Sequence, residues 1–205
     1  MYVGRIVTVG KTGEPFAAYR VSSRSFPNRQ AVETSKGIAI VPRPGHENDV
    51  FKNPYLAYNC LRIAKDAVVV TNGSHTDPIA EKIDSGMSPR DALALTLIAM
   101  DYEKDDYNTP RIAGVIQQDT GYLAIVRHDG IEVRSFPLVA GKCRVVATYE
   151  LDHLTDQEHD IDAPSADLCA KFVVEGGFFK DLEHPVCSAA MHSREGHLAT
   201  HNVGM

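Results

Sequence analysis

Cysteine is sparse in this chain, with four residues among 205. Cys60, Cys143, Cys169 and Cys187 are far apart, and no two of them form the Cys-x-x-Cys spacing of a zinc ribbon. Nothing about them indicates an oxidising compartment. Cys60 lies in a stretch of alternating apolar residues, and we expect it to be a small buried hydrophobe.

The sequence also lacks long apolar runs, and none approaches the roughly 20 residues needed to span a bilayer. At the N-terminus, Gly4 and Arg5 interrupt the apolar residues, which argues against a signal peptide, so we expect a cytoplasmic protein. Neither Gly-x-x-x-x-Gly-Lys-Ser/Thr nor Gly-x-Gly-x-x-Gly occurs, so the two best-known nucleotide fingerprints are missing. The formal net charge of -6 argues against a broad surface for nucleic acid.

Short alternating or β-branched stretches dominate the chain. They predict strands at residues 2–9, 16–21, 38–41, 57–63, 67–70, 112–116, 122–127, 131–136 and 145–149. Helices are predicted at 79–85, 92–102 and 165–174, with Ser88 and Ser165 as caps, and a further helix at 178–191. This succession predicts an α/β or α+β sandwich of mostly antiparallel sheets. We expect one domain over residues 1–190 and a flexible tail over 191–205.

The stretch from Arg20 to Arg29 is polar (Arg-Val-Ser-Ser-Arg-Ser-Phe-Pro-Asn-Arg) and directly follows a predicted strand. Arginine carries a planar fork that matches two phosphate or carboxylate oxygens at a time. Serine hydroxyls supply further donors to the same anion. The stretch therefore predicts a pocket for a phosphate-bearing small molecule. The alternative is an ordinary solvated loop, because arginine and serine are common on protein surfaces.

Two further residues are candidates for proton transfer. Glu103 follows a helix that we expect to be buried, and partial desolvation raises the pKa of a carboxylate and suits it to proton transfer. The alternative is a solvated acidic tail, like the aspartates around it. Tyr58 and Asn59 are adjacent on a strand and point to opposite faces, so only one can face a pocket. The alternative for Tyr58 is a core tyrosine with a hydrogen-bonded hydroxyl.

The turn at residues 72–77 (Asn-Gly-Ser-His-Thr-Asp) contains a serine, a histidine and an aspartate. Such neighbours lack the geometry of a catalytic triad, whose members come from separate segments. Asn72, Ser74 and His75 are better suited to donate hydrogen bonds to a polar ligand. We expect no metal site among three C-terminal histidines that share no helical face and no ligand motif: His192, His197 and His201.

Five blocks of the sequence resemble a known family. They are Tyr-Arg-Val-Ser-Ser-Arg-Ser-Phe-Pro-Asn-Arg (19–29), Asn-Pro-Tyr-Leu-Ala-Tyr-Asn-Cys (53–60), Asn-Gly-Ser-His-Thr-Asp (72–77), Ala-Met-Asp-Tyr-Glu-Lys-Asp (99–105) and Asn-Thr-Pro-Arg-Ile-Ala (108–113). These blocks are similar to the archaeal-type IMP cyclohydrolase. The resemblance covers residues 1–150 well and the C-terminal quarter only loosely.

The resemblance implies the four-layer αββα sandwich of the N-terminal-nucleophile hydrolases. Those hydrolases need a freed Ser, Thr or Cys as first residue. This chain begins with Met1 and Tyr2, so amide hydrolysis is not implied. The resemblance also implies a homotetramer.

The activity implied by the resemblance is the last step of purine synthesis. In it, 5-formamidoimidazole-4-carboxamide ribotide (FAICAR) closes to inosine monophosphate (IMP) and releases water, without metal or cofactor. Tyr58, Glu103 and Arg29 would be the catalytic residues, with Tyr58 donating to the formyl oxygen. The substrate-binding residues would be Arg20, Ser23, Arg24, Asn53, Asn72, Ser74, Lys104 and Arg111.

Two functions of other classes are open at this point. One is an amidohydrolase of the same fold that uses Ser74 or Cys60 as nucleophile. The other is a sensor that binds purine nucleotides and leaves the formamido substrate unchanged. An acid–base pair at positions 58 and 103 would be superfluous in such a sensor.

Overall fold

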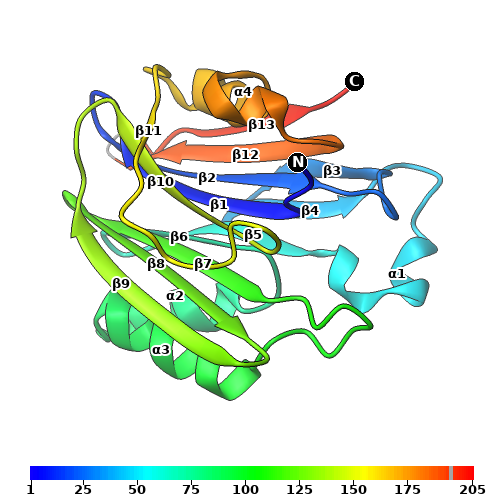
Figure 1. Cartoon of the computed structure of the whole chain (residues 1–205), viewed down its shortest axis with the longest axis horizontal. Coiled ribbons are helices and arrows are strands. Elements are labelled where there is room, and N and C mark those ends of the chain that lie inside the picture. Colours follow the sequence, from blue (N-terminus) through cyan, green and yellow to red (C-terminus); the bar gives the residue numbers. More distant parts are fainter. Residues whose placement is uncertain (194–195) are drawn as a thin grey trace.

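The computed structural model describes residues 1–193 and 196–205 and stacks them in four layers (Figure 1). Two β-sheets face each other in the middle. Helix α4 (Ala166–Glu175) covers the outer face of sheet A. Helices α2 (Thr76–Asp84) and α3 (Pro89–Met100) cover the outer face of sheet B. The chain is therefore an α+β structure with mostly antiparallel sheets, as the sequence predicts.

Sheet B is a continuous meander, because its seven strands lie side by side in the order in which they occur in the chain. The short helix α1 (Asp49–Lys52) and the 3₁₀ turn η1 (Pro54–Leu56) lie between β4 and β5, and α2 and α3 lie between β6 and β7. The strands are β3 (Arg29–Thr34), β4 (Gly37–Pro42), β5 (Tyr58–Ala64), β6 (Ala67–Thr71), β7 (Arg111–Gln117), β8 (Thr120–Arg127) and β9 (Gly130–Pro137).

Sheet A is assembled from both ends of the chain. Its strand order is β11-β10-β1-β2-β12-β13, so the N-terminal hairpin lies between strands from the C-terminal part. The strands are β1 (Arg5–Lys11), β2 (Pro15–Ser22), β10 (Lys142–Ala147), β11 (His159–Asp160), β12 (Pro185–His192) and β13 (Leu198–Asn202).

All residues of strand β2 are buried, and they contribute to two different hydrophobic cores. Ala17, Tyr19 and Val21 pack between the two sheets. Phe16 and Ala18 point the other way, into the core under helix α4. Successive side chains of a strand point to opposite faces, so a strand between two layers carries apolar residues on both.

Both predicted helix caps are confirmed. The Ser88 side chain accepts a hydrogen bond from the Asp91 N–H at 3.2 Å, and Ser165 accepts one from the Leu168 N–H at 3.3 Å. The helix expected to run to residue 102 ends at Met100, because Asp101 adopts a φ of 55° and turns the chain out of the helix.

The helix expected at 178–191 is wrong. Residues Gly177–Asp181 form only the 3₁₀ turn η2, and β12 follows as a central strand between β2 and β13. Every residue of β12 after Pro185 is buried, so the strand lacks the alternation that marks a half-exposed one. A continuous buried run of this length cannot be told from a helix by its pattern alone.

The flexible tail expected at 191–205 is also wrong for its central part, which forms edge strand β13. Asn202 on this strand fastens sheet A to sheet B. Its Oδ1 accepts from the Ala31 N–H at 2.8 Å, and its Nδ2 donates to the Ala31 carbonyl at 3.0 Å. The polar residues that suggested fraying belong to an edge strand instead. Residues 194–195 of the expected tail lie outside the described residues.

The sheets approach each other closely at Gly114 on β7. A methyl group there would lie 2.8 Å from Val7 Cγ1 and 2.9 Å from Val9 Cγ1, both on β1 of the other sheet. We predict that Gly114→Ala lowers the free energy of unfolding by about 1–3 kcal/mol, measured by urea denaturation. Gly13→Ala is the control, because a methyl group at Gly13 would meet no atom within 4 Å. Equal stability of the two variants would contradict close packing of the sheets at this point.

Candidate active site

A buried carboxylate contacts guanidinium groups from both sheets. Arg5 on β1 donates from Nη2 to Glu103 Oε2 at 3.0 Å. Arg111, the first residue of β7, places Nη1 at 3.7 Å from Glu103 Oε1. The Glu103 side chain is only 1% exposed. A carboxylate this deeply buried needs paired charges, and the two arginines supply them.

The loop between α3 and β7 directs Glu103 inward. The Glu103 N–H donates to the Thr109 carbonyl at 2.8 Å. The Asp105 carboxylate accepts from the Thr109 N–H at 2.8 Å and from its hydroxyl at 2.6 Å. Arg111 Nε donates to the Asp101 carbonyl at 2.9 Å. These bonds close the loop on itself and hold Glu103 beside Arg111.

Three buried polar atoms of this cluster have no hydrogen-bond partner among the described residues: Arg5 Nε, Glu103 Oε1 and Arg111 Nη1. Gly73 lies against them, since a methyl group there would be 3.1 Å from Arg111 Nη1 and 3.5 Å from Glu103 Oε1. Buried polar atoms without partners are rare in folded proteins and indicate a site for a ligand or an ordered water. The cluster thus offers both donors and an acceptor to a bound molecule.

The cluster shifts the protonation of its members. Burial raises the pKa of Glu103, and the positive charges of Arg5 and Arg111 reduce this rise without cancelling it. For Arg5, burial alone would lower the pKa, but Glu103 and nearby tyrosines outweigh it and leave the pKa of Arg5 raised. A carboxylate with a raised pKa accepts a proton more readily near neutral pH, as a general base must.

Tyr19 on β2 and Tyr58 on β5 form a second buried polar contact between the sheets. Their hydroxyl oxygens are 2.7 Å apart. Burial raises the pKa of Tyr58 to about 12, although the charges of Arg29 and Arg5 oppose the rise. Burial and the neighbouring Tyr58 raise the pKa of Tyr19 well above its ordinary value. Both phenols are therefore protonated at neutral pH and act as donors.

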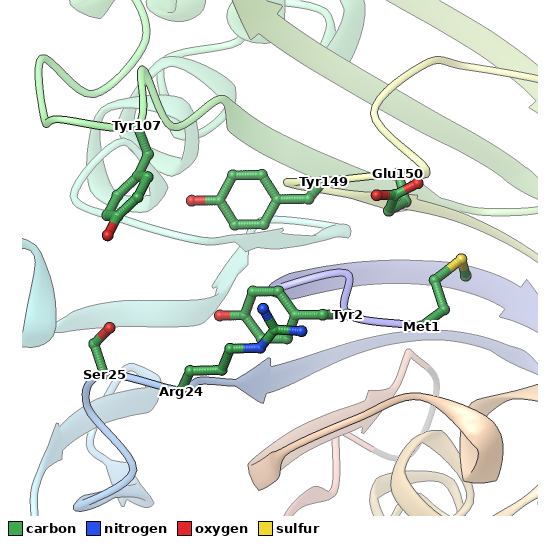
Figure 2. A pocket seen from close by; sticks show the side chains of 7 residues that line it. All are labelled: Met1, Tyr2, Arg24, Ser25, Tyr107, Tyr149 and Glu150. Atoms are coloured by element: carbon green, nitrogen blue, oxygen red, sulfur yellow. The ribbon is translucent and has the colours of Figure 1, made fainter.

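Two cavities that share lining residues open beside Arg5, whereas Glu103, Arg111, Tyr19 and Tyr58 line neither of them. The inner one has a volume of about 370 Å³ and is lined by Tyr2, Arg5, Ser23, Ser25, Phe26, Asn53, Asp105, Asp106, Tyr107, Thr109 and Tyr149. The outer one, of about 550 Å³, is lined by Met1, Tyr2, Arg24, Ser25, Tyr107, Tyr149 and Glu150 (Figure 2). Four lining residues are common to both, and each volume suits a small-molecule ligand.

Glu183 orders the rim of the outer cavity. One of its oxygens lies 2.9 Å from the N-terminal amine of Met1, and the other accepts from Arg24 Nη2 at 3.1 Å. The Arg24 guanidinium also lies over the Tyr2 ring, 4.2 Å from its centroid (Figure 2). The Tyr2 ring in turn stacks on Tyr149 at a centroid distance of 6.0 Å. The rim therefore combines two stacked tyrosine rings with the cationic Arg24 and the acidic Glu183 and Glu150.

Several residues predicted from the sequence do lie at these cavities. Ser23 and Asn53 line the inner cavity, and Arg24 lines the outer one. Asn53 also caps η1 by accepting from the Tyr55 N–H at 2.8 Å. Arg29 is buried at the start of β3 and is close enough to Tyr58 for its charge to lower the pKa of that phenol.

Arg20 is different, because it lies on the other face of sheet A. It alternates with Tyr19, so its guanidinium enters the layer below α4. There it donates to the carbonyls of Val173, Val174, Phe179 and Leu182. The prediction that Arg20 binds substrate is wrong, since this guanidinium is already engaged in holding the C-terminal segments.

Asn72 and Ser74 also lie outside the cavities. The buried Asn72 side chain donates to the Pro110 carbonyl at 3.0 Å and accepts from the Ile112 N–H at 2.8 Å. It therefore fastens the end of β6 to the start of β7. Ser74 is exposed and lines neither cavity.

The serine, histidine and aspartate of the same turn do not form a triad. His75 Nε2 contacts the Ile112 carbonyl at 3.0 Å, and burial together with Arg111 lowers the pKa of His75 to about 3. Asp77 instead accepts from Arg62 at 2.9 Å and from the amide of Asn59. His75 is therefore a neutral, buried ring beside the Glu103 cluster.

Lys104 and Cys60 are the remaining candidates. Lys104 is exposed, pairs with Asp101 and lines neither cavity, so the structure does not bring it to the site. Cys60 is fully buried, and its thiol donates to the Ile38 carbonyl at 3.4 Å. Burial raises the pKa of Cys60 well above its ordinary value, so this thiol is a poor nucleophile.

Sequence reasoning missed several residues of the site, among them Arg5, Tyr19 and Tyr149. Strand alternation carries a signal for Tyr19, since it shares a face with Ala17 and Val21. Arg5 pairs with Val21 across β1 and β2, but its value as a site residue depends on Glu103, which is 98 positions away. No local pattern connects the two.

Known proteins of one family are similar to this chain over nearly its whole length. The model of the family described as IMP cyclohydrolase-like protein matches residues 2–197. The chain belongs to this family. The IMP cyclohydrolase of Methanosphaera stadtmanae is 50% identical over 197 residues, covering 95% of this chain and 96% of the relative. That of Methanocella arvoryzae is 49% identical over 202 residues, covering 96% and 95%.

The family resemblance noted in the sequence is thus confirmed, and it extends past residue 150. The IMP cyclohydrolase of Methanocaldococcus jannaschii matches over 201 residues at 44% identity, covering 96% of each chain.

Within residues 1–193 and 196–205, no group of three or more His, Cys, Asp or Glu side chains could hold a metal ion. No helix in the described part of the chain is long and apolar enough to cross a membrane.

We predict that Arg20→Met destabilises the protein without weakening its affinity for IMP, the nucleotide in the family's name. The substitution removes the guanidinium donor from four buried carbonyls, of which the Phe179 carbonyl keeps a bond from the Leu182 N–H at 3.1 Å. A buried carbonyl left without a partner typically costs about 1–3 kcal/mol. Urea denaturation measures the loss of stability, and calorimetric titration below the unfolding transition measures the Kd. A variant of normal stability that no longer binds IMP would return Arg20 to the anion site.

Proposed function

We propose that this chain is an IMP cyclohydrolase, closing FAICAR to IMP with loss of water. Similarity to enzymes of that name over nearly the whole chain supports the reaction. The structural observation that carries the proposal is the buried Glu103 held by Arg5 and Arg111. All three residues have polar atoms without partners among the described residues, and Arg5 lines the inner cavity.

The reaction needs a base and a donor on opposite sides of one forming bond. The carboxamide nitrogen is a poor nucleophile and loses a proton as it attacks the formyl carbon. The formyl oxygen gains negative charge at the same time and needs hydrogen-bond donors. Glu103 supplies the base, because burial raises its pKa toward the working range. Tyr58 supplies the donor, because its pKa of about 12 keeps it protonated.

Loss of water completes the reaction and restores both groups. The first step leaves a cyclic carbinolamine, a protonated Glu103 and a Tyr58 phenolate. The proton on Glu103 then passes to the departing hydroxyl, which leaves as water. The ring nitrogen derived from the formamido group returns its proton to Tyr58 as the C=N bond forms. The protons balance without a metal or a cofactor.

The arginines divide into three roles under this proposal. Arg20 is engaged with backbone carbonyls, and Arg29 is buried near Tyr58, where its charge stabilises the phenolate. Arg24 remains for the phosphate, because its side chain is 56% exposed at the outer cavity. Ser23 and Asn53, which line the inner cavity, would contact the ribose or the imidazole substituents.

The structure disfavours the amidohydrolase alternative. Its nucleophile would be Ser74, which is exposed while its neighbour His75 contacts the Ile112 carbonyl, or Cys60, whose thiol is fully buried with a raised pKa. A nucleotide sensor would need the cavities but not a buried carboxylate between two arginines.

Three further properties remain predictions under this proposal. They are the likeness to N-terminal-nucleophile hydrolases, the homotetramer and the cytoplasmic location.

We predict that Tyr58→Phe and Glu103→Gln each lower kcat by about 100-fold or more, because each removes one partner of the proton transfers. The measurement is absorbance-monitored conversion of FAICAR by chelator-treated protein. Tyr122→Phe and Glu132→Gln are the matched controls, since Tyr122 packs in the helix layer and Glu132 pairs with Arg127 on sheet B. Near-normal turnover in either test variant would remove that residue from the mechanism. Tight IMP binding without any turnover by the parent protein would favour the sensor.

The pH profile gives a separate test. Glu103 must be ionised to act as base, so kcat rises with pH through its raised pKa. Arg5 lowers the pKa of Glu103, so Arg5→Met moves this acidic limb to higher pH. Arg90→Met, at the exposed start of α3, leaves the limb in place. If the acidic limb of the kcat profile moved to lower pH in Arg5→Met, or persisted in Glu103→Gln, a group other than Glu103 would be responsible for it.

A further inference from the structure

In the hydrogen bond between the Tyr19 and Tyr58 hydroxyls, burial decides which of the two is the donor. The two oxygens are 2.7 Å apart, and only one of the two hydroxyl protons can lie between them. Either Tyr19 donates and the Tyr58 proton is free, or the reverse holds. The choice determines which phenol can give a proton to a bound molecule.

The surroundings of the two hydroxyls differ. Tyr19 is 0% exposed, whereas Tyr58 is 8% exposed. Among the described residues, the Tyr19 hydroxyl has no hydrogen-bond partner besides Tyr58. If Tyr58 were the donor, the Tyr19 proton would be buried without an acceptor, which folded proteins avoid. If Tyr19 is the donor, the unshared proton lies on Tyr58, the less deeply buried of the two residues.

We propose that Tyr19 is a positioning residue that donates to Tyr58, presents the Tyr58 proton to the substrate and stabilises the phenolate after transfer. This inference rests on the function proposed above. In the step concerned, the O–H bond of Tyr58 breaks and an O–H bond to the formyl oxygen forms. The Tyr19 proton stays on Tyr19 throughout and only strengthens its hydrogen bond, because donors bind an anionic oxygen more tightly than a neutral one.

Charges around the pair lower the cost of ionising Tyr58. The positive charges of Arg29 and Arg5 favour the Tyr58 phenolate. Tyr58 is therefore surrounded by groups that stabilise its ionised form, even though burial opposes ionisation.

The fold fixes Tyr19 firmly enough for such a role. It lies in the middle of β2, opposite Val7 of β1 on one side and Ala189 of β12 on the other. Groups on the central strands of a sheet are held more precisely than groups on loops. Tyr58 comes from the other sheet, so the stacking of sheet A on sheet B sets the distance between the hydroxyls.

The kinetic test uses Tyr19→Phe, which removes one oxygen atom and keeps the ring. We expect kcat for FAICAR to fall about 10-fold or more while KM stays within about two-fold, because the Tyr19 hydroxyl acts through Tyr58. In a Tyr58→Phe background, Tyr19→Phe should cause no further loss of kcat. Tyr122→Phe serves again as the matched control. A further loss in that background, or a raised KM with unchanged kcat, would overturn the proposal.

A second readout does not depend on turnover. NMR of protein labelled at tyrosine Cζ follows ionisation of each phenol, and the Tyr58 signal is assigned by its absence in Tyr58→Phe. With pH rising, Tyr58 should begin to ionise at lower pH in the parent protein than in Tyr19→Phe. The opposite order, or no difference, would show that Tyr19 does not donate to Tyr58. If the parent protein fails to convert FAICAR, the proposed reaction is wrong, and this titration still decides the direction of the bond.

Discussion

The site depends on the ion pairing of Glu103 with two guanidinium groups. Arg5 belongs to sheet A and Arg111 to sheet B, so one carboxylate is shared by the two halves of the sandwich. Neither arginine alone would compensate a carboxylate that is buried so completely. The groups can come together only after the sheets have stacked, so the chemistry of the site is a property of the tertiary structure.

The same logic applies to the phenol pair, since Tyr19 and Tyr58 also come from opposite sheets. Polar groups between two apolar sheets oppose packing, and a protein selected only for stability would replace them. Around them the core is conventional, with Gly114 letting the sheets approach closely. The polar groups are thus held in place by a core that is tightly packed elsewhere.

Much of the fold follows from the sequence because the signals are local. The strands of sheet B alternate or form β-branched runs, and Ser88 and Ser165 mark their helices. The site is harder to predict. Arg20 stands in the most conspicuous basic stretch, yet the strand turns it toward α4, whereas Tyr19 beside it enters the site. Arg5 acquires its role only from a partner far along the chain. The polarity of a stretch identifies candidate site residues. Which of them belong to the site depends on the face of the strand on which each side chain lies and on the residues that it contacts there.

The topology of the sheets has a consequence for folding during synthesis on the ribosome. Sheet B can form hairpin by hairpin as the chain emerges, because its strands pair in order of synthesis. The N-terminal hairpin cannot complete sheet A until β10 and β12 have been made. Asn202 then joins β13 to Ala31 on the edge strand that begins with Arg29. A growing chain therefore carries Tyr58 and Glu103 before it has the strands that complete sheet A, and the sandwich that aligns these groups closes only after β10, β12 and β13 have been made.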